Sequence, residues 1–167
     1  MVCKFLWNQR NGHGHGPLLN IGMHIRRTDY PKYERKQHKS KPLNSEYYND
    51  AMEYFREEYA NCLFVVASDD IKWAKKYIDD SRNDVFFSDT NPKFRKIEDE
   101  DGVMYTMMDL DMSKALFDLT LLTNCNHTII SRGTFSMWIA LLTPGEYYTE
   151  YGAIMPAQDH ETSRLIK

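Results

Sequence analysis

The feature that most restricts the possible folds is a regular alternation of short apolar runs with segments of helical periodicity. Each apolar run has the length of one strand, and in the segments between them apolar residues recur every three or four positions. Strands that alternate with helices are typical of a parallel sheet with helices on both faces. We therefore expect an α/β fold, with strands at 19–25, 63–67, 85–87 and 128–130, helices at 44–59, 71–78, 115–122 and 137–142, and a last strand within 146–154.

The length of 167 residues allows one ordinary domain with a hydrophobic core. We expect a loop at 1–17, the α/β domain at 18–155 and a polar tail at 156–167. Residues 93–111 are charged, with a small apolar segment at 103–108. We expect a surface excursion there and assign it no function.

Composition excludes several classes of function. A net charge of −3 and a pI near 6.1 give no reason to expect nucleic-acid binding. The three cysteines are widely spaced without a CxxC pair, and the His-Gly tract at 12–16 has no fixed geometry, so no metal site or disulfide framework is predicted. No apolar run approaches the ~20 residues that span a bilayer.

Polar residues gather at the end of the first predicted strand. His24 and Arg26 lie two positions apart and therefore project from the same face, and Arg27 and Asp29 follow where the strand should end. Burying such charges is unfavourable unless they are paired. Arginine forks match phosphate oxygens two at a time, which favours a phosphorylated ligand. The alternative is a structural Arg-Asp ion pair.

Two other predicted strands also end in polar residues. Ser68, Asp69 and Asp70 follow the second strand, and residues 131–134 follow the fourth and open a helix, whose free N–H groups favour anions. Either Ser68 or Asp69 is expected to cap the helix after the second strand. The remaining acid could hold magnesium, or accept hydrogen bonds from a base or ribose. Since ligands of open parallel sheets bind beyond the carboxyl ends of the strands, we expect a nucleotide- or phosphate-binding half of an α/β enzyme. Neither GxGxxG nor GxxxxGK[ST] is present.

Three motifs carry a resemblance to a known family. The sequence HIRRTDY at 24–30 resembles the HxRRxDY motif of α-1,2-fucosyltransferases, glycosyltransferase family 11. The segments 121–130 and 133–138 resemble the second and third motifs of that family, and 64–70 matches the strand between them. The resemblance covers about residues 18–143, with order and spacing preserved.

The resemblance implies inverting transfer of L-fucose from GDP-β-L-fucose to a terminal galactose of a glycan, without a required metal or other cofactor. It also implies the Rossmann-like donor-binding half of a GT-B-like enzyme. Related α-1,6-fucosyltransferases have a glutamate at the spacing of Glu34. By position, the resemblance assigns the β-phosphate clamp to Arg26, guanosine contacts to His24 and Asp70, a phosphate contact to Gly133, Thr134 and Phe135, the general base to Glu34, and support of the site to Arg27, Asp29, Ser68, Asn126 and His127.

Members of this family are longer, with an N-terminal domain and, in animals, a Golgi membrane anchor. We therefore expect a fragment that carries the donor-binding half, with lumenal Golgi location and membrane attachment implied only by the resemblance. Two alternatives stay open. The chain could be a GDP-sugar-binding module or inactive fragment that transfers nothing, or a phosphate-binding regulatory domain unrelated to sugars.

Overall fold

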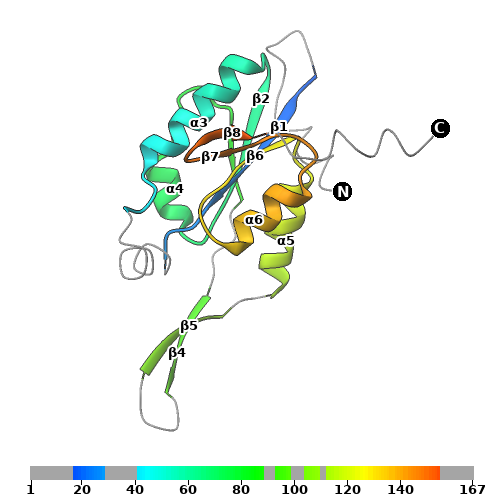
Figure 1. Ribbon diagram of the computed structural model, residues 1–167. Coiled ribbons are helices and arrows are strands. Elements are labelled where there is room, and N and C mark those ends of the chain that lie inside the picture. Colours follow the sequence, from blue (N-terminus) through cyan, green and yellow to red (C-terminus); the bar gives the residue numbers. More distant parts are fainter. Residues whose placement is uncertain (1–16, 29–40, 89–92, 99–103, 110–111, 155–167) are drawn as a thin grey trace, which may run out of the picture.

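The computed structural model describes residues 17–28, 41–88, 93–98, 104–109 and 112–154 (Figure 1). Its main sheet has the strand order β3-β2-β1-β6-β7-β8, and β4 and β5 form a separate two-stranded sheet. In chain order the elements are β1 Leu19–Ile25, α3 Ser45–Glu58, β2 Cys62–Ser68, α4 Ile71–Tyr77, β3 Val85–Phe87, β4 Lys93–Glu98, β5 Met104–Asp109, α5 Met112–Thr123, β6 His127–Ile129, α6 Thr134–Leu142, β7 Tyr147–Thr149 and β8 Gly152–Ile154.

The topology confirms the predicted α/β class. The main sheet is parallel from β3 to β7, and only β8 pairs in the antiparallel direction. The chain runs outward from β1 through β2 to β3 and then returns to β6 on the other side of β1. The strand order therefore reverses between β1 and β6, which is the place where open α/β sheets bind ligands.

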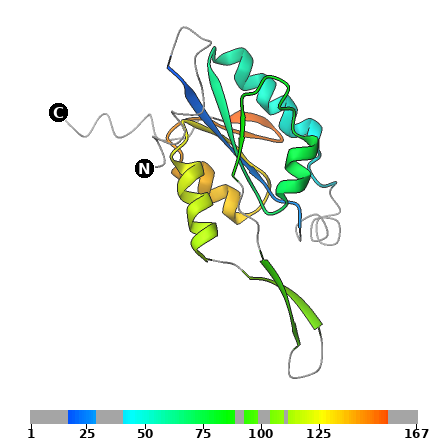
Figure 2. The ribbon, with the colours of Figure 1, turned by 180° about the vertical axis from the view of Figure 1, so that it is seen from behind.

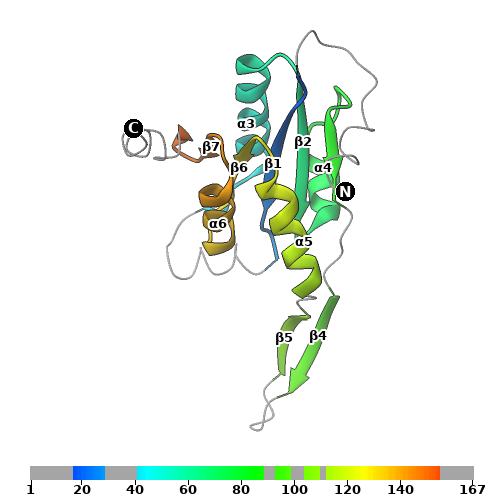
Figure 3. The ribbon, with the colours of Figure 1, turned by 90° about the vertical axis from the view of Figure 1, so that its right-hand side faces the viewer.

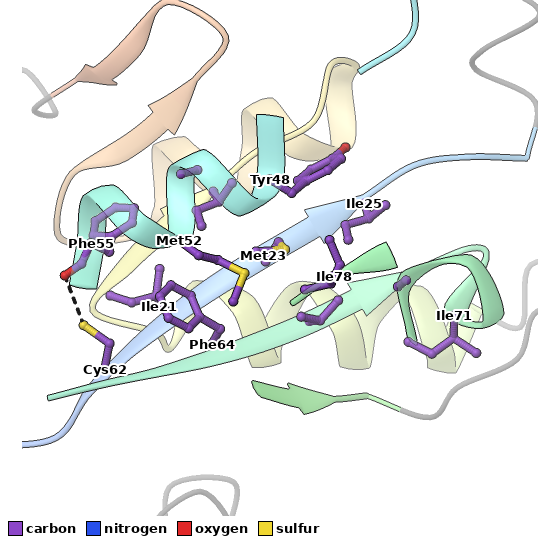
Figure 4. Close-up of a cluster of buried hydrophobic side chains, with 14 residues drawn as sticks. Ile21, Met23, Ile25, Tyr48, Met52, Phe55, Cys62, Phe64, Ile71 and Ile78 are labelled. Carbon is purple, nitrogen blue, oxygen red and sulfur yellow. Dashed lines mark hydrogen bonds between the residues drawn. The ribbon is translucent and has the colours of Figure 1, made fainter. Parts of the chain in front are cut away.

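The helices cover both faces of the sheet (Figure 3). On one face α3 and α4 pack against side chains of β1 that include Ile21, Met23 and Ile25 (Figure 4). On the other face α5 and α6 pack against side chains of β2 that include Val65. Because both faces are covered, β2 is buried along its whole length, as its continuous apolar sequence predicts.

The helix starts show one confirmed expectation and one error. Asn44 caps α3, since its side chain accepts a hydrogen bond from the Tyr47 N–H at 3.1 Å. The predicted cap of α4 was Ser68 or Asp69, but Asp70 takes that role and accepts from the Trp73 N–H at 3.0 Å. Three consecutive polar residues all suit a cap, so the sequence alone did not distinguish them.

The segment expected to be a featureless surface excursion contains the β4–β5 hairpin. Its strands pair from Lys93 opposite Asp109 to Glu98 opposite Met104. In Figures 1, 2 and 3 the hairpin extends away from the main sheet. These two strands were not predicted, because the segment is charged and a strand outside a core needs no apolar run. The single last strand expected within 146–154 is likewise a hairpin, β7–β8.

Candidate functional site at the switch point

The candidate site lies at the carboxyl edge of the sheet, where β1 and β6 diverge. Arg26 and Arg27 follow β1, and residues 130–133 connect β6 to α6. The parallel register sets Met23 beside Ile129, so the residues that follow each strand emerge at the same edge. The structure thus brings the first and third predicted motifs together.

His24 lies on β1 and connects these two segments through the contacts of its side chain. Its Nδ1 lies 2.6 Å from Ser136 Oγ and 3.1 Å from Ser131 Oγ, and the two hydroxyl oxygens are 2.9 Å apart. The ring also packs on Phe135, with centroids 4.9 Å apart. Burial, together with the positive charges of Arg26 and Lys114, lowers the pKa of His24 to about 3. His24 is therefore a neutral imidazole at physiological pH.

Asp69 fixes the chain as it leaves β1. Its carboxylate accepts hydrogen bonds from the Arg27 N–H at 2.7 Å, the Thr28 N–H at 3.1 Å and the Thr28 hydroxyl at 2.6 Å. These bonds restrain the backbone next to Arg26. This role was not predicted from the sequence, because it depends on the pairing of β1 with β2, which sets Ile25 opposite Ser68 and so places the following residues side by side.

Arg27 was expected to support Arg26 through an ion pair with Asp29, which lies outside the described residues together with Glu34. Among the described residues, the guanidinium of Arg27 donates to the Leu43 carbonyl at 2.8 Å and lies 4.3 Å from the Trp73 ring centroid. Arg27 therefore ties the end of β1 to the start of α3 and to α4. These contacts were not predicted, and the support of Arg26 by Arg27 stays a prediction.

Ser68 and Asp70 both shape the turn after β2. Ser68 is buried and accepts a hydrogen bond from the Asp70 N–H at 3.0 Å, and one oxygen of Asp70 caps α4. The predicted supporting role of Ser68 thus has a physical basis. The predicted contact of Asp70 with guanosine would use the carboxylate oxygen that the cap leaves open.

The N-terminus of α6 has the features of an anion site. Gly133 caps it with φ 111° and ψ 161° and supplies no side-chain hydrogen bond to the first turn. The first N–H groups of a helix have no partner within the helix, and the helix dipole favours a negative ligand there. Thr134 is exposed beside them, and Phe135 is half-buried against His24.

Replacing Gly133 with alanine should distort this anion site. Side chains rarely adopt φ 111° with ψ 161°, so the change is expected to cost about 1–3 kcal/mol of folding stability. Nucleotide affinity should also fall, because the first turn of α6 must reorient. Gly152, at φ 103° in the β7–β8 turn, provides a matched control that should lose stability only. Urea unfolding and titration with GDP measure both effects, and equal GDP affinities in the two variants would contradict this role.

A pocket of about 650 Å³ lies between α6 and the β7–β8 hairpin, and its lining includes Ser131, Gly133 and Thr134 at and just before the start of α6. Arg132 and Glu150 line it and form a double ion pair, with Nε donating to Oε1 at 2.8 Å and Nη2 contacting Oε2. Arg132 also donates to the Lys41 carbonyl at 3.0 Å. The other side chains that line the pocket include Met137, Leu141, Tyr147 and Tyr151.

Asn126 and His127, predicted to support the site, lie at the opposite edge of the sheet. Asn126 pairs with Asn20 at the start of β1, through its side chain at 2.8 Å and its N–H at 2.7 Å. His127 accepts from the Glu146 N–H at 3.1 Å and stacks on Tyr59. Asn126 precedes β6 and His127 is its first residue, whereas the site lies after β6. Their role is to hold β6 between its neighbours.

Asp118 is a buried acid that the sequence analysis did not select. It contacts the Lys114 ammonium at 2.9 Å and the hydroxyl of Ser88, just after β3, at 3.3 Å. The sequence signal that could have identified Asp118 was an acidic residue within an apolar helical pattern, because acids are rarely buried without a partner. Asp118 connects α5 to the same carboxyl edge of the sheet.

Within the described residues, no group of three or more histidine, cysteine or acidic side chains could hold a metal ion. The helices of that same part of the chain include none long and apolar enough to cross a membrane.

Comparisons with known proteins agree with these motifs. A family model described as Glycosyl transferase family 11 matches residues 2–162. Galactoside alpha-(1,2)-fucosyltransferase 1 of Saimiri boliviensis boliviensis is 32% identical over 154 residues, covering 92% of this chain and 36% of that protein. Galactoside 2-alpha-L-fucosyltransferase Sec1 of Mus musculus is 36% identical over 133 residues, covering 80% and 31%. The chain thus spans about a third of the length of these curated relatives.

A solved structure supports the fold. The crystal structure of fucosyltransferase NodZ from Bradyrhizobium aligns with a TM-score of 0.52, covering 93% of this chain and 46% of that chain, at 16% identity. At this identity the likeness concerns the fold alone, and it agrees with the Rossmann-like sheet.

Proposed function

Because the chain belongs to glycosyltransferase family 11, we propose that it forms the GDP-fucose-binding half of a galactoside α-1,2-fucosyltransferase. In the proposed reaction, L-fucose passes with inversion from GDP-β-L-fucose to a terminal galactose of a glycan, without a metal. The observation that carries the proposal is the meeting of His24, the residues after β1 and the start of α6 at the switch point of the sheet. Lumenal Golgi location and membrane attachment belong to the same proposal.

In this proposal Arg26 clamps the β-phosphate and stabilises the charge that develops as GDP leaves. The start of α6, with Gly133, Thr134 and Phe135, receives a phosphate. His24 and Asp70 contact the guanosine. Since GDP is a stable leaving anion, positioning and electrostatic stabilisation would supply most of the catalysis.

The acceptor hydroxyl also needs a base, and we assign Glu34 to that role from the family resemblance alone. Replacing Glu34 with glutamine should lower the turnover at saturating donor by roughly 10²–10⁴-fold, because general-base catalysis contributes on that order. The affinity for GDP should not change. Radiolabelled fucose transfer to a terminal galactoside measures the turnover. Unchanged turnover would reject the assignment.

A second candidate function is a GDP-sugar-binding module that transfers nothing. It needs only the proposed donor site at the switch point of the sheet and no acceptor-binding surface. The two candidates share the donor site and differ in whether binding is followed by transfer or donor hydrolysis. Their common premise is therefore tested first.

The test is calorimetric titration of the chain with GDP and GDP-fucose, with ADP as the control. We expect saturable binding of both guanine nucleotides and much weaker binding of ADP. Product analysis with GDP-fucose and a galactoside then distinguishes the enzyme from the binding module. Absence of guanine-nucleotide binding by a folded, monodisperse sample would reject both candidates for this chain.

A further inference from the structure

We infer that Ser131 and Ser136 are positioning residues that hold His24 as the tautomer with its proton on Nε2. His24 would then present a fixed hydrogen-bond donor to an acceptor atom of the bound nucleotide. The identity of this ligand rests on the proposed function. The tautomer rests only on contacts between described residues.

The tautomer follows from counting protons in the His24–Ser131–Ser136 cluster. Among the described residues, each serine hydroxyl has only the other hydroxyl and His24 Nδ1 within hydrogen-bond distance. If Nδ1 carried a proton, it could accept from neither serine, and one hydroxyl proton would have no acceptor. If Nδ1 is unprotonated, Ser136 donates to it at 2.6 Å and Ser131 donates to Ser136 at 2.9 Å. Only this second arrangement satisfies every group.

The proton of the neutral ring must then reside on Nε2. Burial and two nearby cations keep the ring neutral, since they place its pKa near 3. In the described part of the chain no acceptor is recorded for Nε2, although the residue is only 7% exposed. The buried side-chain polar atoms that lack a partner in this part of the chain do not include Nε2, so Nε2 is accessible and can donate to a ligand atom that reaches it.

A fixed donor restricts which ligand atoms can be recognised. Phosphate oxygens accept hydrogen bonds, and so do O6 and N7 of guanine. Adenine has a donor amino group in place of O6, so an Nε2–H aimed there would disfavour it. The cluster therefore selects an acceptor, and a comparison of GDP with ADP distinguishes guanine O6 from N7 and the phosphates, which both nucleotides share.

The tautomer can be measured without any ligand. Two-bond ¹H–¹⁵N correlation spectra report which ring nitrogen is protonated, and His24→Gln identifies the His24 signals among the six histidines. We expect an unprotonated Nδ1 and a protonated Nε2 from pH 5 to 8. A protonated Nδ1 in the wild-type chain would overturn the inference, whatever the result of nucleotide titration.

Serine variants test the positioning role. Ser131→Ala and Ser136→Ala each leave one hydroxyl that can donate to Nδ1, so both should keep the wild-type tautomer. The double variant Ser131→Ala/Ser136→Ala should show exchange between the two tautomers, because nothing then fixes Nδ1 as an acceptor. A double variant with the wild-type nitrogen signals would show that the serines do not set the tautomer.

Two substitutions of His24 test the ligand contact. A glutamine amide reaches about as far as Nε2, whereas an asparagine amide reaches about as far as Nδ1. His24→Asn should therefore weaken GDP binding roughly tenfold, and His24→Gln should weaken it less. A loss for GDP alone identifies guanine O6 as the acceptor, and an equal loss for ADP identifies N7 or a phosphate, which both nucleotides share. No loss for either nucleotide would overturn the contact while leaving the tautomer result intact.

Discussion

Replacing Arg26 with alanine is expected to weaken GDP binding roughly ten- to a hundredfold. A charge-assisted hydrogen bond to phosphate contributes about 1.5–3 kcal/mol, and a bidentate arginine makes two of them in a fixed plane. Arg26 follows β1 directly, and Asp69 restrains the backbone beside it through Arg27 and Thr28. Calorimetric titration with GDP measures the loss.

Two further variants distinguish the charge and the planar geometry of the Arg26 guanidinium from the general effect of removing a surface arginine. Arg26→Lys keeps the charge but loses the planar fork, so its GDP affinity should fall between those of wild type and Arg26→Ala. Arg82→Ala removes an arginine that is 55% exposed and precedes β3, at the opposite edge of the sheet. Its GDP affinity should equal that of wild type. Equal affinities of the Arg26→Ala and Arg82→Ala variants would contradict the clamp.

The sequence predicted those parts of the fold that depend on local pattern. The continuous run at 63–67 identified β2, because a strand covered on both faces needs apolar side chains throughout. Alternation identified β1, and polar residues after β1, β2 and β6 marked the edge where ligands bind. Helix 134–142 began three residues earlier than its apolar pattern, because Gly133 and Thr134 form its start without apolar side chains.

The parts that were not predicted depend on contacts between distant segments. The cluster of His24 with Ser131 and Ser136 joins residues more than a hundred positions apart, so no local pattern reveals it. Asp69 was missed for the same reason, since its partners Arg27 and Thr28 follow the neighbouring strand and are 42 and 41 positions away in the sequence. Asn126 belongs to a family motif, yet it lies at the amino edge of the sheet, away from the candidate site. A motif shows which residue is required but not why, so the position of Asn126 could not be predicted from it.

Gly145 was interpreted from its local sequence pattern, but the structure shows that close approach of a distant segment requires a glycine there. Pro144 and Gly145 were interpreted as the end of the last helix, and α6 does end at Leu142. A Cβ on Gly145, however, would lie 2.2 Å from the Asn126 carbonyl oxygen and 2.6 Å from His127 Nδ1. The glycine is thus required by close approach of the chain before β7 to the chain before β6.

Replacing Gly145 with alanine should therefore lower the free energy of unfolding by about 3 kcal/mol. The Asn126 carbonyl is backbone and cannot rotate away, so the chain must shift and weaken the bond from the Glu146 N–H to His127. For a domain of this size the thermal midpoint should fall by roughly 6–12 °C. Urea unfolding and circular dichroism measure both quantities.

Gly152→Ala is the control that separates steric contact from backbone strain. A Cβ there meets nothing within 4 Å, but φ is 103°, so only strain opposes the side chain. Its cost should be smaller, about 1 kcal/mol. If Gly145→Ala were as stable as Gly152→Ala, the approach between these two segments would not be tight.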